Sequence, residues 1–404
     1  MTLENPLRGN RVSYLSNLTP MRGIAAILTV ILHCNLFMSD ALVPASASML
    51  LHRMYLMVDF FFILSGFIMC YVYGSRFNER VTKKEFEKFT IARFSRVYPL
   101  HLTTLLFTIV LFFFSSRLGV PKLMIMEVDN NSYTMLTNLL LLQSMNLHNW
   151  FSWVHASWSI STEWWAYMVF PFLVAPFLKL NSTGRGLICV ACFAGYAIIT
   201  FLIIPIVPFP PTMPFLKENP ADLTINVAYQ YGFLRCLCGF ILGMMMHHAY
   251  SDGWGKKFLG NGWTMVILTI AAFTCMHFYL PDLITLVFFP LLLLCGAYGS
   301  PAVNRLFSLR PLQRIGDWSF SIYLVHQPLL FVIFKTMDYI SMHRSKTGLP
   351  VDPPVPGFFI AWTICLGFLA LTLFVARLTY RYVENPARRW LNAKAASTPA
   401  VVLN

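Results

Sequence analysis

Long apolar segments separated by short polar connections make up most of this chain. A transmembrane helix needs about 20 consecutive, mostly apolar residues, and ten segments approach this length. They cover residues 21–40, 54–74, 98–115, 164–179, 186–205, 228–248, 263–280, 283–299, 318–337 and 356–378. A further apolar stretch, 135–147, is too short to cross a bilayer and is expected to be interfacial or re-entrant. The pattern predicts an all-α, polytopic transmembrane helix bundle.

Composition and segment length agree with that class. Hydrophobic residues make up 57% of the chain and charged residues only 12%. The first 20 residues lack the apolar run and cleavage site of a signal peptide. We therefore expect a single membrane domain over residues 1–390 and a short cytoplasmic tail over 391–404. Any chemistry is expected within the bilayer or at its edge.

The distribution of Lys and Arg predicts the orientation. If the N-terminus lies in the cytoplasm, ten crossings place most basic residues on the inside, as the positive-inside rule requires. Both termini are then cytoplasmic, and residues 135–147 do not cross. The formal net charge of +13 follows from this bias, so it does not indicate a nucleic-acid partner.

Arg22 and His33 are informative because polar residues are rare in the first predicted span. They are eleven residues apart, which places them on one helix face about 16 Å apart. Inserting an ionisable group into a membrane costs about 3 kcal/mol or more of free energy, so such groups usually face a protein interior or a wet cavity. The pair is a candidate functional site. The alternative is that Arg22 extends to the interface and His33 bonds a neighbouring helix.

A basic segment, residues 76–96, precedes the third predicted span. It ends with Arg93-Phe-Ser-Arg96-Val-Tyr-Pro99, where that helix is expected to begin. Arg93 and Arg96 then share a helix face. Two guanidinium groups at the inner membrane edge are suited to binding phosphate. The alternative is anchoring to anionic lipid headgroups.

The predicted outer half of the bundle holds further polar residues. Asp59, near the start of the second span, is expected at the depth of His33, where a carboxylate would orient the imidazole. Tryptophans at the entry of the fourth span are typical of a membrane interface, and their rings also stack on sugars. The segment from 155 to 163 contributes His155, Trp158, Ser161 and Glu163 to this outer end.

Two further spans carry polar residues at membrane depth. Arg235 lies well inside the sixth span and needs a partner there. The candidates are the carboxylates of Asp59 and Glu163. In the ninth span Ser319, Tyr323 and His326 are spaced by four and three residues, so they share one face. His326 then lies near the middle of the bilayer. Hydrogen bonding between helices is the alternative to a site role.

The nine cysteines all lie in apolar segments and say little about redox compartment. Cys189 and Cys192 have the Cys-x-x-Cys spacing, but no second pair or nearby histidines accompany them. Packing between helices is therefore favoured over metal binding. The histidines are dispersed along the chain, and no metal site is expected.

Six motifs together carry a family resemblance. They are Arg22-x10-His33, Val58-Asp-Phe-Phe-Phe-Ile-Leu-Ser-Gly-Phe67, Arg93-Phe-Ser-Arg96-Val-Tyr-Pro99, Trp158-Ser-Ile-Ser-Thr-Glu163, Ser319-Phe-Ser-Ile-Tyr-Leu-Val-His326 and Tyr382-Val-Glu-Asn-Pro386. In this order, over about residues 21–390, the chain resembles the acyltransferase-3 family of integral membrane O-acyltransferases. It is similar to the stand-alone form, which lacks a C-terminal esterase-like domain.

The resemblance implies transfer of an acyl group, usually acetyl from acetyl-CoA, to a hydroxyl of a carbohydrate or similar acceptor. It implies that Arg22 and His33 are essential, and that Arg93 and Arg96 handle the donor. The missing esterase-like domain implies direct transfer to a glycan or glycolipid acceptor at the membrane, with no permanently bound cofactor. A bacterial inner membrane is the expected location.

Residues and resemblance together predict a mechanism. Coenzyme A would dock at the cytoplasmic side, where Arg93, Arg96 and Arg22 hold its phosphates. His33 would act as general base on the acceptor hydroxyl or accept the acyl group transiently. Asp59, Glu163 and His326 are the further catalytic candidates, and Asp59 or Glu163 would orient His33. The candidates for binding the acceptor are His155, Trp158, Ser161 and Arg235.

A different class of function remains as the alternative. Buried Arg, His, Asp and Glu residues can form a relay in a proton-coupled transporter or a glycan flippase. Such a protein would not need paired arginines at the inner edge or an outer segment rich in tryptophan and serine. Transfer or hydrolysis of an acyl donor by the purified protein would separate the two classes.

Overall fold

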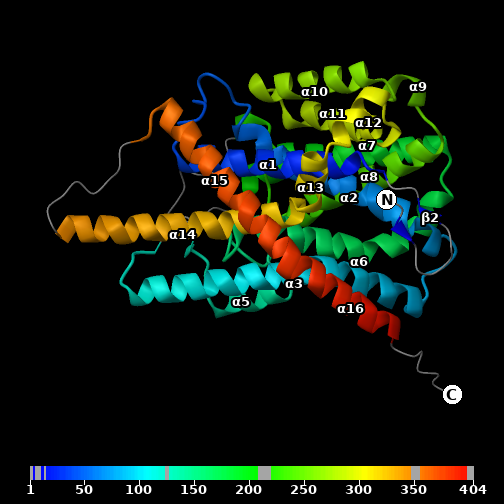
Figure 1. Ribbon diagram of the computed structural model, residues 1–404. Helices are drawn as coiled ribbons and strands as arrows, with labels where there is room; N and C mark the ends of the chain where they lie inside the picture. Colours follow the sequence, from blue (N-terminus) through cyan, green and yellow to red (C-terminus); the bar gives the residue numbers. More distant parts are fainter. Residues whose placement is uncertain are drawn as a thin grey trace.

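Long helices form the body of the computed structural model, which describes residues 3–4, 11–12, 15–122, 127–207, 220–346 and 355–397 (Figure 1). Each of the ten predicted segments corresponds to one long helix. These helices are α1 (Leu18–Phe37), α2 (Met57–Tyr73), α3 (Lys83–Arg117), α6 (Trp158–Leu178), α7 (Ser182–Ile198), α8 (Gly232–Ser251), α10 (Gly262–His277), α11 (Asp282–Tyr298), α14 (Ser319–Lys346) and α15 (Phe358–Thr379).

Short elements connect or extend the long helices. The short α-helices are α5 (Ser132–Leu139), α9 (Lys256–Leu259), α12 (Pro301–Phe307), α13 (Arg310–Asp317) and α16 (Asn385–Ser397). The 3-10 turns are η1 (His52–Leu56), η2 (Gly74–Arg76), η3 (His155–Ser157), η5 (Ile204–Ile206) and η7 (Pro220–Asp222), and the π-helical turns are η4 (Ile199–Ile203) and η8 (Tyr380–Glu384). Two strands, β1 (Leu3–Glu4) and β2 (Arg11–Val12), pair antiparallel. Of the predicted tail, 391–397 belong to α16 and 398–404 lie outside the described residues.

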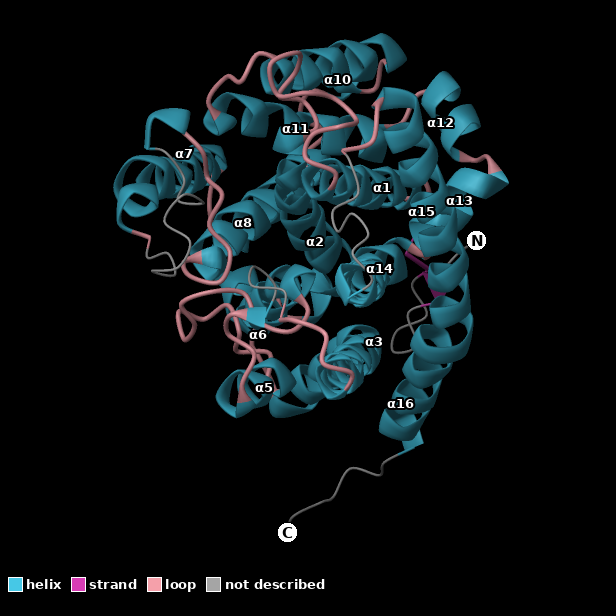
Figure 2. Ribbon diagram, turned by 90° about the vertical axis from the view of Figure 1, so that its left-hand side faces the viewer, coloured by secondary structure: helices cyan, strands magenta, loops and turns pink. Residues whose placement is uncertain are grey.

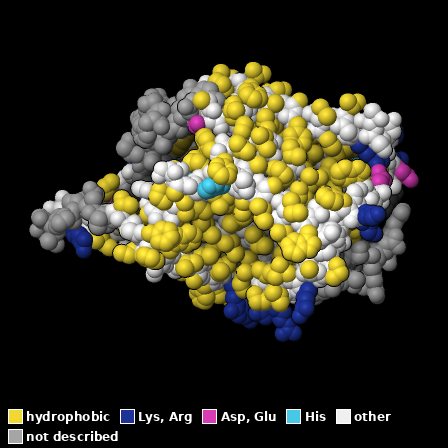
Figure 3. Space-filling model, turned by 90° about the horizontal axis from the view of Figure 1, so that it is seen from above, with side chains coloured by type: hydrophobic (Ala, Val, Ile, Leu, Met, Phe, Trp, Pro, Cys, Tyr) yellow, Lys and Arg dark blue, Asp and Glu magenta, His cyan; other side chains and the backbone are white. Residues whose placement is uncertain are grey.

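The fold is that of a polytopic helical membrane protein, as predicted. Within the described residues, 7 helical segments are long and apolar enough to cross a membrane, and the bent pair α11–α12 makes up to 8. The count is lower than the ten predicted spans because α10 has only 16 residues and α6 does not meet the same test. Hydrophobic side chains cover the middle of the face shown in Figure 3, and charged ones lie toward its edges.

The bend between α11 and α12 has a local cause. Gly299 has a φ of +67°, a conformation that side chains with a Cβ rarely adopt. Ser300 then caps α12, since its hydroxyl accepts a hydrogen bond from the Val303 amide, and Pro301 begins the helix. The two axes therefore meet at 89°.

Helix α3 begins earlier than predicted. Its first residue is Lys83, and the Thr82 hydroxyl caps it by accepting from the Glu85 amide at 3.3 Å. The predicted basic loop 76–96 is therefore largely helical, and Arg93 and Arg96 lie within a continuous helix of 35 residues. The hydropathy pattern missed this because the first turns of α3 are polar and extend beyond its apolar part.

The predicted short segment at 135–147 is a brief helix followed by irregular chain. Helix α5 lies beside α3 (Figures 1 and 2), and the His101 ring is hydrogen bonded to the Asn138 carbonyl at 2.9 Å. The chain then returns to α6, where Ser161 and Trp165 both donate to the Leu141 carbonyl. These contacts hold the segment against the bundle.

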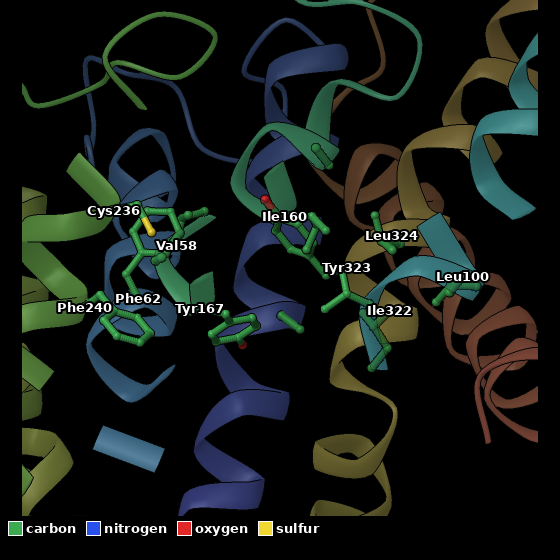
Figure 4. Packing of buried hydrophobic residues seen from close by; sticks show 14 of the residues in the cluster. Val58, Phe62, Leu100, Ile160, Tyr167, Cys236, Phe240, Ile322, Tyr323 and Leu324 are labelled. Atoms are coloured by element: carbon green, nitrogen blue, oxygen red, sulfur yellow. The ribbon is translucent and has the colours of Figure 1, made fainter. Parts of the chain in front are cut away.

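Helices α2 and α8 are in direct backbone contact near the middle of the bundle (Figure 2). A Cβ on Gly66 would lie 1.8 Å from the Phe240 carbonyl oxygen, and one on Gly243 would lie 1.9 Å from that of Ile63. Small residues allow this close approach, which strengthens van der Waals packing between membrane helices. Val58, Phe62 and Phe240 pack into the core beside this contact (Figure 4).

Gly243→Ala is expected to destabilise the protein by about 1–3 kcal/mol or more, because the added methyl group must push the α2 backbone away. The thermal midpoint of the protein in detergent measures the effect. Gly367→Ala in α15 is the matched control, because nothing lies within 4 Å of its Cβ position. An equal midpoint for the two variants would contradict the close packing of α2 on α8.

Candidate active site

Two cavities lie inside the bundle. The first, which we call the arginine cavity, has a volume of about 120 Å³, and its lining includes Arg22, Ser65, Arg93, Arg96, Glu163 and Tyr167. The second, the histidine cavity, has a volume of about 370 Å³, and its lining includes His33, Tyr55, His155, Trp158 and Gln327. Val58 of α2 and Tyr323 of α14 line both cavities. The two cavities therefore meet at these two side chains.

The arginine cavity contains cations without carboxylate partners. Arg22 makes no hydrogen bond or ion pair with any described residue, and it is only half-buried. Arg93 donates to the Tyr73 hydroxyl at 2.6 Å, and its guanidinium lies over the rings of Tyr73 and Tyr167. The positive charge also acts on Asp317, which lies outside the spans. Burial raises the pKa of its carboxyl group, and nearby guanidinium groups, Arg22 among them, limit that rise. Three guanidinium groups and one carboxylate, that of Glu163, line the cavity, so positive charge predominates there and favours an anion.

Arg96 differs from the other two arginines because it has a buried carboxylate partner. It forms an ion pair with Glu384, which is 1% exposed. Glu384 also accepts a hydrogen bond from Ser321 at 2.9 Å. Sequence reasoning gave Glu384 no role, although it lies in the closing motif from 382 to 386. The predicted phosphate contact therefore has to compete with this ion pair at Arg96.

Glu163 lines the arginine cavity rather than the cavity that contains His33. It accepts hydrogen bonds from the hydroxyls of Ser65 and Tyr167. The expected contact between Glu163 and His33 is not among the contacts of the described residues. Glu163 is five residues beyond the start of α6, which places it about 7.5 Å deeper along the helix.

His33, which lines the histidine cavity, lies beside the buried His326. The rings of His33 and His326 are 4.9 Å apart. Nδ1 of His33 lies 2.9 Å from the Thr29 carbonyl, and Nδ1 of His326 lies 3.3 Å from that of Ile322. A carbonyl can only accept, so in the neutral rings Nδ1 carries the proton and Nε2 is left as the base. Nε2 of His326 is buried without a hydrogen-bond partner in the described part of the chain.

Asp59 pairs with Arg235 rather than with His33. Both side chains are fully buried, and their atoms meet at 2.6 and 3.0 Å. Of the two partners predicted for Arg235, the structure has Asp59. The predicted orienting contact with His33 is not formed, because both carboxylate oxygens accept from the guanidinium group. Arg235 also lies over the Trp158 ring at 5.3 Å, so it backs the cavity wall and does not line either cavity.

The other residues predicted to bind the acceptor separate into two groups. His155 and Trp158 line the histidine cavity, and His155 stacks on Phe151. Ser161 is fully buried and donates to the Leu141 carbonyl at 2.7 Å, so it holds the segment after α5. Gln327, which sequence reasoning missed, lines the cavity with its Oε1 bonded to the Ala156 amide.

Comparison with known proteins identifies the class. The Acyl_transf_3 family model, described as an acyltransferase domain, matches residues 16–381. The chain belongs to this family, and it is a multi-pass membrane acyltransferase. An enzyme is therefore favoured over the transporter considered as the alternative.

Three relatives are similar to this chain. Acyltransferase MdmB of Streptomyces mycarofaciens is 27% identical over 95% of this chain and 94% of its own length. Peptidoglycan O-acetyltransferase OatA of Listeria monocytogenes is 22% identical over 93% of this chain, which spans 56% of that relative. Protein 2 in picA locus of Rhizobium radiobacter is 30% identical over 35% of this chain and 73% of its own length. No solved structure matches the chain.

Arg235→Met is expected to destabilise the protein by about 3–5 kcal/mol, because it leaves the Asp59 carboxylate buried and unpaired. The double variant Asp59→Leu, Arg235→Met removes both charges and should recover part of the loss. Thermal midpoints in detergent measure both effects.

Arg185→Met is the matched control for this pair. Arg185 pairs with the exposed Asp252, and exposed pairs contribute about 1 kcal/mol or less. If Arg235→Met were no more destabilising than this control, the buried pair would not be a main support of the bundle.

Proposed function

We propose that this acyltransferase moves an acetyl group from acetyl-CoA to a hydroxyl of a carbohydrate acceptor, at the junction of the two cavities. The observation that carries the proposal is a cavity lined by three arginines, two of them outside any ion pair with a described residue, next to a cavity lined by the His33 imidazole. The O-acetyltransferase name of the Listeria relative supports the acetyl group and a glycan acceptor.

The arginine cavity is the proposed donor site. Coenzyme A carries phosphates, which guanidinium groups bind with matching geometry. Arg22 and Arg93 supply that charge, because neither is in an ion pair with a described residue. Arg96 is a weaker candidate, since its charge is compensated by Glu384.

The histidine cavity is the proposed acceptor site. Aromatic rings of Trp158, Tyr55 and Phe151 line it, and such rings stack on the apolar faces of sugars. The Gln327 side chain offers its amide hydrogens, since its oxygen is already bonded. The histidine cavity has a volume of about 370 Å³, which leaves room for a sugar unit.

His33 is the proposed general base. Its Nε2 removes the proton from the acceptor hydroxyl, and the oxygen forms a bond to the acyl carbon. The bond between that carbon and sulfur then breaks, and the CoA sulfur receives the proton. Asp59 and Glu163 do not orient His33 in this scheme. The Thr29 carbonyl does so from within the same helix.

The proposed setting is a bacterial inner membrane with both termini in the cytoplasm. Helix α1 begins and α16 ends at the same end of the bundle (Figure 1). The positive-inside bias favours the cytoplasm for this end, which is the side from which acetyl-CoA would enter.

Arg22→Ala and Arg93→Ala are each expected to weaken acetyl-CoA binding by about 10- to 100-fold, because each removes charge-assisted hydrogen bonds of about 1.5–3 kcal/mol. Calorimetry on the purified protein in detergent measures the dissociation constant. Arg185→Ala, outside both cavities, is the control and should bind as the wild type does. Unchanged binding in both cavity variants would contradict the donor site.

His33→Gln is expected to lower kcat by about 10²- to 10⁴-fold, as loss of a general base does, with acetyl-CoA binding retained. Release of CoA thiol is measured with a chitin oligosaccharide as the acceptor probe, together with acetylation of the sugar by mass spectrometry. His277→Gln is the control, since His277 is exposed and bonded to Ser48. A fully active His33→Gln variant would remove the base from the mechanism.

A further inference from the structure

Tyr323 occupies a position that the donor and acceptor cavities share. Its side chain lines both, and so does that of Val58. Val58 has no polar atom, so the Tyr323 hydroxyl is the polar side-chain group common to the two cavities. Any acyl group that passes from the arginine cavity to an acceptor in the histidine cavity has to pass these two side chains.

Contacts on both sides hold the Tyr323 ring in place. The side chain is 6% exposed, and its ring lies 6.0 Å from that of His326 and 6.1 Å from that of Phe61. Because His326 in turn contacts His33, the phenol and the proposed base belong to one contiguous cluster. A ring packed in this way presents its hydroxyl in a fixed direction, which hydrogen bonding to a transition state requires.

Among the described residues, the hydroxyl of Tyr323 is hydrogen bonded to Ser159 Oγ, at 2.8 Å. Ser159 can donate its proton either to Tyr323 or to the Ala156 carbonyl, 3.3 Å away. When Ser159 donates to Tyr323, the phenolic proton is released for a further acceptor. Rotation of one serine hydroxyl thus converts Tyr323 into a donor without movement of the backbone.

Thioester transfer places a negative charge at this junction. As the acceptor oxygen bonds to the acyl carbon, the carbonyl oxygen becomes an oxyanion before the bond to sulfur breaks. A donor already in position for that charge lowers the barrier more than one that must reorient. The guanidinium groups of the arginine cavity are assigned to the CoA phosphates, so the oxyanion needs a different donor.

We propose that Tyr323 is a catalytic residue that donates a hydrogen bond to the oxyanion of the tetrahedral intermediate, with Ser159 as its positioning residue. This assignment rests on the proposed function, because it presumes that a thioester reaches the junction from the donor cavity. The proton stays on the phenol throughout, so the atom balance of the transfer is unchanged.

The test is Tyr323→Phe, which removes one oxygen and keeps the ring. We expect kcat for CoA release to fall by about 10²- to 10³-fold, with the acetyl-CoA dissociation constant and the thermal midpoint unchanged. Ser159→Ala should lower kcat by a smaller factor. Tyr196→Phe is the matched control, since Tyr196 is fully buried, lines neither cavity, and its hydroxyl has no partner among the described residues.

A second variant keeps the proposal testable if Tyr323→Phe folds poorly. Replacement of Tyr323 by a fluorinated tyrosine retains the shape and makes the phenol a stronger donor. At a pH where this phenol stays protonated, kcat should rise relative to the wild type. A purely structural role would leave kcat unchanged.

The outcomes separate the two proposals. If the wild type releases CoA and Tyr323→Phe retains kcat within about threefold, the oxyanion assignment is overturned and the acetyl transfer stands. If the wild type neither binds nor consumes acetyl-CoA, the proposed function fails, and the assignment of Tyr323 fails with it.

Discussion

Each charge inside this bundle has to be either paired or in contact with a cavity, and the structure is organised by that constraint. The low dielectric of a membrane interior makes an isolated charge costly. Asp59 and Arg235 satisfy the requirement by pairing in a fully buried contact between α2 and α8, where glycines bring the two backbones together. Arg22 and Arg93 satisfy it differently, because both line the arginine cavity.

This division separates supporting charges from charges available to a substrate. The Arg96–Glu384 pair resembles the Asp59–Arg235 pair in having a buried carboxylate, and it fixes the π-helical turn η8 against α3. The unpaired arginines next to it retain their attraction for an anion. Arginines thus serve two purposes in this bundle. Those paired with a buried carboxylate hold helices together, and those outside an ion pair are available to an anion.

The meeting of two cavities is the feature on which the proposed transfer between two substrates rests. In the proposed function, a charged donor and a hydroxyl acceptor need different surroundings. One cavity is rich in arginine, and the other is mostly aromatic and polar, with Arg53 paired to Asp282. The bundle provides both, and Val58 and Tyr323 mark where they join. The tautomer of His33 is set by a helix carbonyl, so the proposed base does not depend on a carboxylate to orient it.

Sequence alone determined the class of fold, the ten helical segments, the placement of Arg22 and His33 on one helix, and the motifs of the family. These follow from local regularities, because apolar length and helical spacing can be read over a few tens of residues. The start of α3 escaped this reasoning, since its first turns are polar and carry no hydropathy signal.

Only the tertiary structure decided which charges pair and which cavity each side chain lines. Arg96 and Glu384 are 288 residues apart in sequence, and Asp59 and Arg235 are 176 apart. Asp59 had two candidate partners, His33 and Arg235. Glu163 was expected near His33, but it lines the arginine cavity. The physical reason is that hydropathy and helical periodicity report on a helix's own faces, whereas a partner is set by the rotation and depth at which distant helices pack.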